Sequence, residues 1–137
     1  MNNNEHKLQN SFIKEFTSYY NKRKEKNLNL VVFIDQDSLM RNQKSFFDFE
    51  FITSKNCVLI ELKYTDKKIK NPLSLLTDYQ KNIFNFIWST SQKTVYTSCL
   101  MILVESQKEL ILFCKEKKIV GKEEIFKFLV GILDEKI

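Results

Sequence analysis

Residues 46–65, FFDFEFITSKNCVLIELKYT, carry the pattern that decides the fold of this chain. Aromatic and acidic residues alternate in residues 46–52, and residues 57–64 (CVLIELKY) form an apolar run that ends in the same alternation. Because successive side chains of a strand point to opposite faces of a sheet, both segments are predicted to be strands. The residues between them predict a hairpin whose turn is centred between Ser54 and Lys55.

This hairpin would bring two carboxylates together. Asp48 and Glu50 share one face of their strand, as Glu61 and Lys63 do of theirs. The position of the turn sets Asp48 directly opposite Glu61, at a Cβ separation of ~4.5–5.5 Å. Like charges in such a pair destabilise a sheet, so a divalent cation, Mg²⁺ or Mn²⁺, is the expected reason for the arrangement. Glu50, whose partner would be Leu59, is an alternative ligand.

The same residues have a plainer interpretation. In an antiparallel hairpin with one solvated face, polar and apolar residues alternate as a matter of course. Glu61 and Lys63 would then be surface residues with no chemical role. If the site is functional, Lys63 would orient an attacking water or offset developing charge.

Helical and strand patterns follow one another along the rest of the chain. An amphipathic helix is predicted over residues 5–20 from the spacing of Leu8, Phe12, Phe16 and Tyr19. Residues 30–35 (LVVFID) predict a strand, and Asn71-Pro72 is a typical helix start. The apolar face of this second helix would consist of Leu76, Tyr79, Ile83, Phe86 and Ile87. Two strands (98–104 and 109–114) and a closing helix (123–133) complete the chain.

The order α-β-β-β-α-β-β-α predicts an α/β fold with one mixed sheet of about five strands flanked by helices. The length of 137 residues fits a single domain over residues 1–137. With two glycines and one proline, the chain offers no glycine-rich phosphate loop, which excludes the Walker and Rossmann classes.

The composition also bears on the compartment and the partners of the protein. The longest apolar run is far shorter than the ~20 residues of a spanning helix, so no membrane association is expected. Three cysteines do not make a closed disulfide set, which favours a reducing cytoplasm, and His6 is the sole histidine, which excludes a Cys/His zinc site. The net charge of +5 and the lysine clusters at 22–26, 63–70 and 115–122 fit either a polyanionic partner or solvated loops.

The hairpin and the helix after it carry a resemblance to a known family. Asp48 followed by Glu61-Leu62-Lys63 resembles the motif of the PD-(D/E)XK nucleases, with Phe47 in place of the proline. Within that superfamily, residues 61–80 (ELKYTDKKIKNPLSLLTDYQ) are similar to RecU-type Holliday-junction resolvases. The positions that match in order are Lys63, Thr65, Pro72, Leu73 and Gln80. This chain is shorter than those resolvases and leaves no room for the stalk between their early strands.

The resemblance implies a restriction-endonuclease-like core and assigns roles to particular residues. Asp48, Glu61 and the backbone carbonyl of Leu62 would hold Mg²⁺ or Mn²⁺, Lys63 would be the catalytic lysine, and Gln80 would assist the catalytic group. The family often adds a glutamate from the first helix, for which Glu5 is the candidate and Glu15 the rival. Gln80 has an alternative as an exposed polar residue of its helix.

The expected activity is Mg²⁺-dependent hydrolysis of DNA, with branched DNA as the favoured substrate and a homodimer as the working form. The protein would be cytoplasmic and associated with the nucleoid. The expected phosphate contacts are Thr65, Lys67, Lys68, Lys70, Lys22, Arg23 and Lys24. Two alternatives remain: a restriction or repair nuclease for linear or flapped DNA, and a non-catalytic DNA-binding or assembly module.

Overall fold

A computed structural model describes residues 3–23, 29–34, 47–89 and 98–134. Its centre is one six-stranded sheet in which the strands follow chain order, β1-β2-β3-β4-β5-β6. β3 and β4 are parallel, and the other neighbouring pairs are antiparallel, so the sheet is mixed. The strands are β1 (Val31–Ile34), β2 (Phe49–Ile52), β3 (Cys57–Thr65), β4 (Ser98–Ser106), β5 (Glu109–Cys114) and β6 (Lys117–Val120). The expected α/β class is confirmed.

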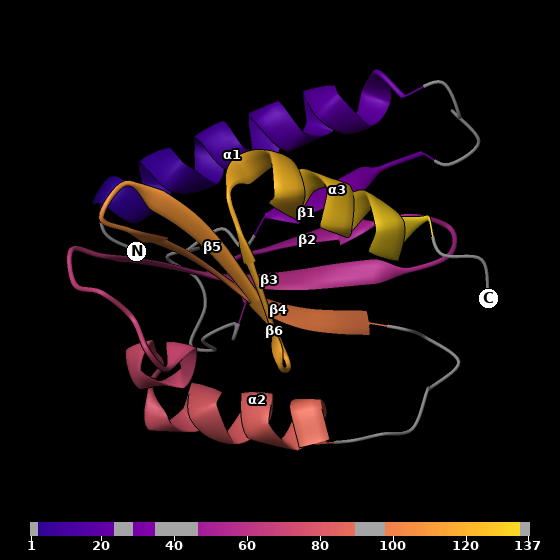
Figure 1. The fold of residues 1–137 in the computed structure, drawn as a ribbon. Coiled ribbons are helices and arrows are strands. Elements are labelled where there is room, and N and C mark those ends of the chain that lie inside the picture. Colours follow the sequence, from indigo (N-terminus) through magenta and orange to yellow (C-terminus); the bar gives the residue numbers. More distant parts are fainter. Residues whose placement is uncertain (1–2, 24–28, 35–46, 90–97, 135–137) are drawn as a thin grey trace, which may run out of the picture.

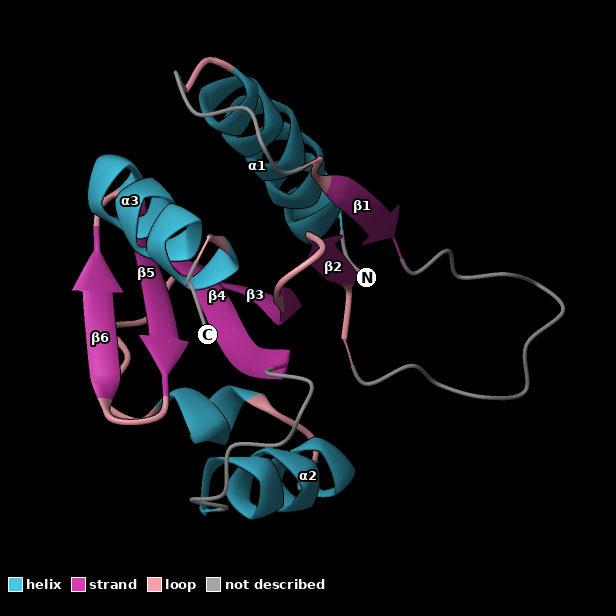
Figure 2. Cartoon of the chain, turned by 90° about the vertical axis from the view of Figure 1, so that its right-hand side faces the viewer, coloured by secondary structure: helices cyan, strands magenta, loops and turns pink. Residues whose placement is uncertain are grey.

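Helices cover both faces of the sheet (Figures 1 and 2). α1 (Asn3–Asn21) and α3 (Lys122–Leu133) lie on one face, and the short 3₁₀ helix η1 (Pro72–Leu75) and α2 (Asp78–Ser89) lie on the other. The connection from β3 through α2 to the parallel β4 is the crossover that parallel strands require. None of the helices in the described ranges is long and apolar enough to cross a membrane.

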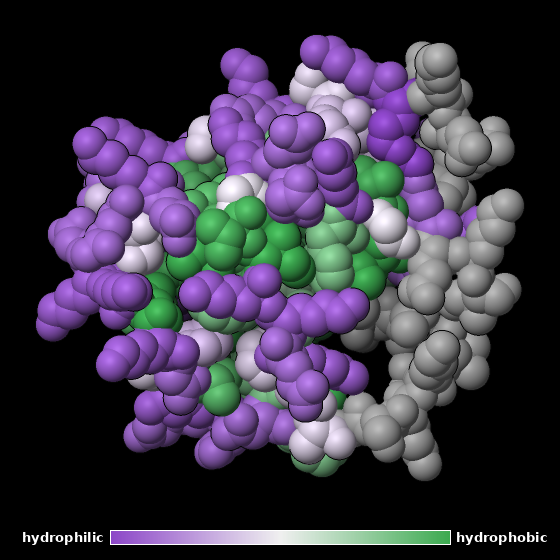
Figure 3. Space-filling model, in the orientation of Figure 1, coloured by the Kyte–Doolittle hydropathy of each residue, from purple (hydrophilic) through white to green (hydrophobic). Residues whose placement is uncertain are grey.

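The alternation of side chains divides the core into two clusters. Phe49 and Phe51 of β2 are fully buried against Phe12 and Phe16 of α1, and Phe126 of α3 completes this aromatic group. The opposite face carries a second cluster, which contains Phe84, Leu100, Ile102, Val104, Ile111 and Phe113. Figure 3 shows hydrophilic side chains around a hydrophobic area near the centre of the face that it draws.

The β2–β3 hairpin has the register that the sequence predicts. Glu50 pairs with Leu59, and the N–H group of Thr53 donates to the Asn56 carbonyl oxygen at 2.9 Å across the turn. The turn also holds the end of α3, because the Thr53 hydroxyl donates to the Leu133 carbonyl oxygen at 2.8 Å and the Asn56 amide to that of Ile132 at 2.7 Å. Both contacts satisfy carbonyls that a helix end leaves without intrahelical partners.

The prediction for the second helix is wrong in two respects. Asn71 caps η1 instead of α2, and α2 begins seven residues later at Asp78, because Thr77 provides a second and stronger start. The predicted apolar face is confirmed for Leu76, Ile83 and Ile87, which pack on the second core cluster. It is wrong for Tyr79 and Phe86, which are 65% and 74% exposed, whereas Phe84, which the spacing did not select, is fully buried. Hydrophobic residues lie on both sides of this helix, so their spacing identified the side that packs on the sheet only in part.

The sheet has six strands instead of about five. The additional strand is β6, which pairs antiparallel with β5 after a turn in which Lys115 has a φ of 54°. Its sequence, KKIV, begins with two lysines and shows little of the pattern of a strand. These residues form a strand because their backbone pairs with the edge of β5.

Candidate functional site

The candidate site lies where three elements end or begin on one side of the molecule. The carboxyl-terminal half of β3 carries Glu61 and Lys63, Asp48 immediately precedes β2, and Gln80 lies in the first turn of α2. Figure 1 shows the start of η1 and α2, the end of β3 and the N-terminal end of α1 at the left of the molecule. Residues far apart in the chain therefore meet at one end of the sheet.

Glu61 is the centre of the group. It is 5% exposed, although a glutamate is seldom buried without partners. Its Oε1 atom lies 3.4 Å from Nζ of Lys63 and accepts a hydrogen bond of 3.1 Å from Nε2 of Gln80. The buried carboxyl group thus has one cationic and one neutral donor.

The surroundings make the proton affinity of Glu61 unusual. Burial is the largest cause and the carboxylate of Asp48 the second, and together they raise the pKa of Glu61 to about 8. Lys63 and the hydrogen bond from Gln80 act in the opposite direction without offsetting them. Glu61 is therefore largely protonated near neutral pH unless a further positive charge arrives.

Asp48 does not form the ladder pair with Glu61 that the sequence predicts. The last pair of the ladder is Phe49 with Ile60. The N–H group of Asp48 also bonds to Ile60, because it donates to the Ile60 carbonyl oxygen at 2.9 Å. Two successive residues thus lie opposite one, as at a β-bulge, and this redirects the Asp48 side chain. Its Oδ2 atom accepts a hydrogen bond of 2.7 Å from the N–H group of Leu62. The two carboxylates still interact, but diagonally across the strand end.

Gln80 has a fixed orientation because it serves two partners. Its Oε1 atom accepts from the N–H group of Thr77 at 3.0 Å, and the Thr77 hydroxyl accepts from the N–H group of Gln80 at 3.2 Å. This reciprocal pair is a capping box at the start of α2. With its oxygen held by the cap, Gln80 presents its NH₂ group to Glu61. Thr77 was not among the predicted residues, although the spacing Thr-x-x-Gln is a recognised helix-start signal.

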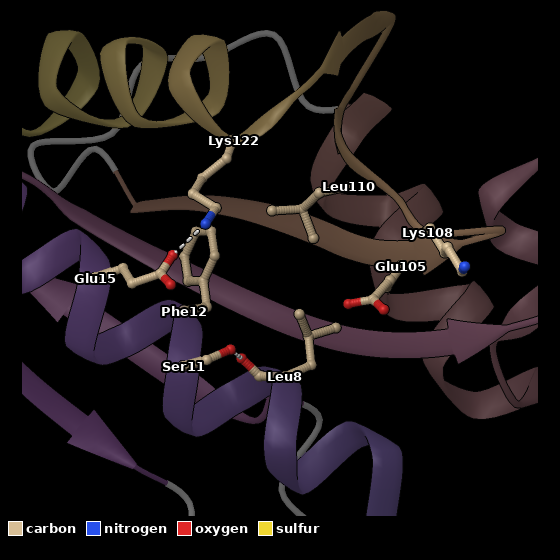
Figure 4. Close-up of a pocket in the computed structure, with 8 residues that line it drawn as sticks. All are labelled: Leu8, Ser11, Phe12, Glu15, Glu105, Lys108, Leu110 and Lys122. Atoms are coloured by element: carbon tan, nitrogen blue, oxygen red, sulfur yellow. Dashed lines mark hydrogen bonds and ion pairs between the residues drawn. The ribbon is translucent and has the colours of Figure 1, made fainter.

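The two glutamates of α1 were the candidates for a further carboxylate ligand. Glu15 forms an ion pair of 2.6 Å with Lys122 of α3, and Figure 4 shows it directed toward that lysine. Glu5 is half-buried in the first turn of α1, on the helix that covers the face of the sheet opposite to the one that carries Glu61. Across the described ranges, no three His, Cys, Asp or Glu residues come close enough to hold a metal ion together. The prediction for Glu5 as a ligand stays a prediction.

Oxygen donors for a hard cation are nevertheless present. Asp48 and Glu61 offer carboxylate oxygens, and the Leu62 carbonyl lies on the same edge of β3 as its N–H group, beyond the last ladder pair. Oxygen ligands are the donors that Mg²⁺ takes in proteins, with waters in the remaining positions. Glu50 lies one pair further inside the hairpin, and burial raises its pKa as well.

The predicted phosphate contacts divide into two groups. Lys67, Lys68 and Lys70 are exposed on the loop that directly follows β3, and the N–H group of Lys67 donates to Thr65 Oγ1 at 3.2 Å. Thr65 is the last residue of β3, and the three lysines follow the end of the strand that carries Lys63.

The second group, which follows the C-terminal end of α1, lies elsewhere. Arg23 forms an ion pair with Asp134 and its guanidinium lies over the Tyr20 ring at 4.4 Å, so this side chain is engaged within the protein. Its contact with a phosphate stays a prediction. Lys22 is exposed beside it, and Lys24 lies outside the described residues. α1 is about 28 Å long, and Figure 1 shows its C-terminal end on the right, away from the site.

No protein-family model matches the sequence, and no curated protein matches it either.

Proposed function

We propose that this chain is a metal-dependent nuclease with a PD-(D/E)XK type of site, in which Asp48, Glu61 and Lys63 are the catalytic group. The observation that carries the proposal is the buried Glu61 carboxyl, which has a pKa of about 8 and lies beside both a second carboxylate and an amine. Strongly shifted titratable groups that share one face are typical of functional sites. A purely structural hairpin would gain nothing from burying this acidic pair.

The arrangement of the elements supports the same proposal. The order α1-β1-β2-β3-α2-β4, with β3 parallel to β4 and with the acidic residue and the Glu-Leu-Lys segment on adjacent strands, fits the restriction-endonuclease-like core that the sequence resembles. The two strands after it form an edge that extends the sheet. Fold alone does not establish activity, so the proposal depends on the site.

Asp48, Glu61 and the Leu62 carbonyl would hold the cation, Mg²⁺ or Mn²⁺. When bound, such an ion lowers the pKa of water and stabilises the charge that develops on a phosphate. The ion pair of Lys63 with Glu61 keeps the amine at the site, with its side chain 21% exposed and so able to reach a bound phosphate. Gln80 holds the Glu61 carboxyl from the side of α2, which fixes the rotamer of that group.

A polyanionic substrate fits the charge of the chain. The net charge is +5, and Lys67, Lys68 and Lys70 are exposed directly after the catalytic strand. Lysines at the exit of the site would contact backbone phosphates without reading sequence. The resemblance to junction resolvases favours branched DNA as the substrate and a homodimer as the active form.

Cleavage of defined DNA substrates tests this function. We expect the wild-type chain to cut a four-way junction, a flapped duplex or a linear duplex in Mg²⁺ and to be inactive in chelator. Lys63→Ala and Asp48→Asn should lower the rate by about 10²-fold or more, while the matched surface variant Lys127→Ala should retain it. Equal products from the wild type and both site variants would identify a contaminating nuclease and overturn the proposal. Paired symmetric nicks in the junction would identify a resolvase.

A second candidate function, a non-catalytic nucleic-acid-binding or assembly module, has one observation in its favour. With a pKa of about 8, Glu61 can be neutral at physiological pH, which removes the repulsion from Asp48 without a cation. Binding of DNA that is insensitive to Mg²⁺ and unaccompanied by any cleavage would favour this module over the nuclease.

A further inference from the structure

A cavity of about 330 Å³ lies next to the candidate site, between the loop after β3 and the strands β4 to β6. Its polar lining comes from three separate segments of the chain: Lys68, then Ser106, Gln107 and Glu109, and Lys118. None of these residues belongs to the catalytic group, and no individual role was predicted for Ser106 or Lys118.

The register of the sheet puts this cavity on the catalytic face. Glu61 pairs with Ile102, Ile102 with Phe113, and Phe113 with Lys118, so the four residues form one row across β3 to β6. Side chains of directly paired residues point to the same face of a sheet. Three strand spacings of about 4.8 Å separate the two ends of the row, or about 14 Å. Lys118 therefore lies on the face that carries Glu61, about 14 Å from it.

This part of the face is open to a ligand. α2 packs against β4, whereas β6 forms the edge of the sheet opposite to β1 (Figure 2). Lys118 is exposed, and Val120, the next residue of β6 on the same face, is 41% exposed. α3 covers the other face of β5 and β6.

The loop that supplies Lys68 is anchored on both sides of it. The Ser106 hydroxyl donates to the carbonyl oxygen of Lys67 at 2.6 Å, and the Ile69 side chain is buried in the core under α2. Lys68 itself is exposed. The backbone that carries its amine is thus held in place before any ligand binds, which lowers the entropic cost of binding.

The charge of the lining selects the class of ligand. Lys68 and Lys118 oppose one carboxylate, Glu109, so the lining carries two positive charges and one negative charge, a net charge of +1. Donors come from the lysines and from the amide of Gln107. Such a set suits a singly charged anion with several acceptor oxygens, as a phosphodiester is.

We propose that this cavity binds a second backbone phosphate of the nucleic-acid strand whose scissile phosphate lies at Glu61 and Lys63. The inference rests on the proposed function and extends it, because it gives the strand a direction, from the end of β3 past the loop that carries Lys68 and toward β6. Lys118 and Lys68 would then add to the affinity without contacting the bond that is cut.

The salt dependence of binding tests the proposal directly. Affinity for a labelled single strand and for a four-way junction is measured over a series of salt concentrations, with Ca²⁺ in place of Mg²⁺. Loss of one phosphate contact should reduce the slope of log K against log salt by about 0.7 for the single strand and about 0.9 for duplex arms. We expect this reduction for Lys118→Ala and for Lys68→Ala.

Two variants complete the experiment. Lys117→Ala is the matched control, because Lys117 lies next to Lys118 on the opposite face of β6, with its amine 5.5 Å from the Phe128 ring centroid, and should leave the slope unchanged. Glu109→Gln removes the opposing carboxylate and should tighten binding. Melting curves establish that each variant is folded.

The outcomes separate this inference from the proposed function. Equal slopes for Lys118→Ala and Lys117→Ala, in a wild-type protein that cuts DNA in Mg²⁺, would overturn the phosphate cavity and leave the nuclease standing. A reduced slope for Lys118→Ala, in a protein that never cuts, would support the cavity and overturn the nuclease. Absence of nucleic-acid binding by the wild type would overturn both.

Discussion

The amide nitrogen of Gln80 lies 3.1 Å from Oε1 of Glu61 and joins the start of α2 to the middle of β3, across 19 residues of the chain. The oxygen of the same amide accepts from Thr77, so the helix cap and the candidate site share one side chain. This link means that the start of the helix determines how the buried carboxyl is held. Variants of Thr77 and Gln80 can separate the two roles.

Thr77→Ala should destabilise the protein by about 1 kcal/mol, because the start of α2 loses the hydroxyl that accepts from Gln80. Gln80→Ala should destabilise it to a similar extent and also raise the pKa of Glu61 further, since the hydrogen bond from Gln80 lowers that pKa. Thermal unfolding and carboxyl NMR titration measure the two effects. A Gln80→Ala variant with an unchanged Glu61 titration would show that the amide does not reach the carboxyl in solution.

The stability of the protein should fall as the pH rises from about 5 to 8. In this range the folded chain retains the proton of Glu61, whose pKa is about 8, while the unfolded chain has lost it near the ordinary value of 4.5. The stabilisation is fully present below pH 4.5 and is lost as the pH rises through 8, with a slope of up to roughly 1.4 kcal/mol per pH unit. Urea unfolding at several pH values measures it.

Glu61→Gln provides the comparison for that profile, because a neutral amide has no proton to lose. The difference in unfolding free energy between wild type and this variant should change with pH in the same window. Glu116→Gln, at an exposed glutamate, should follow the wild-type profile. Parallel profiles for wild type and Glu61→Gln would contradict the buried, protonated carboxyl.

Mg²⁺ should raise the melting temperature of the wild-type protein, and more strongly at pH 8 than at pH 6. The cation needs carboxylate ligands, so at lower pH it must displace the proton of Glu61 before it binds. Asp48→Asn should abolish most of the increase, since it removes one of the two carboxylates. A melting temperature that responds equally to Mg²⁺ in wild type and in this variant would place the ion elsewhere.

The orientation of α2 can be tested by a pair of phenylalanines two positions apart. Phe84→Ala should cost about 3–5 kcal/mol, because the ring is fully buried against the sheet. Phe86→Ala should change the unfolding free energy by less than about 0.5 kcal/mol, because that side chain is 74% exposed. The reverse order of costs would mean that Phe86, which the spacing assigned to the apolar face, packs on the sheet in place of Phe84.

Arg23→Ala should lower the free energy of unfolding and leave nucleic-acid affinity unchanged. Its guanidinium pairs with Asp134 and packs on Tyr20, whose hydroxyl donates to the same carboxylate at 2.8 Å. Loss of this group leaves a partly buried carboxylate with fewer donors. Thermal unfolding together with the slope of log K against log salt distinguishes the roles: a reduced slope with unchanged stability would restore Arg23 as a phosphate contact.

The sequence by itself determined the class of the fold and the hairpin at its centre. In a strand, successive side chains point to opposite faces of the sheet, and the alternation in residues 46–65 reflects this geometry. A short turn between two such segments allows one register, and the observed pair of Glu50 with Leu59 has that register. The association of Glu61 with Lys63 on one face follows from the same local rule. Information of this kind lies within a few residues of the chain, so it can be read without coordinates.

Tertiary structure decided the rest, because burial and long-range pairing depend on what packs against each element. It set the burial of Glu61 under α2, the displacement of Asp48 from the position opposite it, and the side of α2 that faces the sheet. It also committed Arg23 to Asp134 and recruited the lysine-rich β6 to the sheet edge. A residue pattern lists the groups that can meet, whereas the packing of the sheet and its helices selects which of them do.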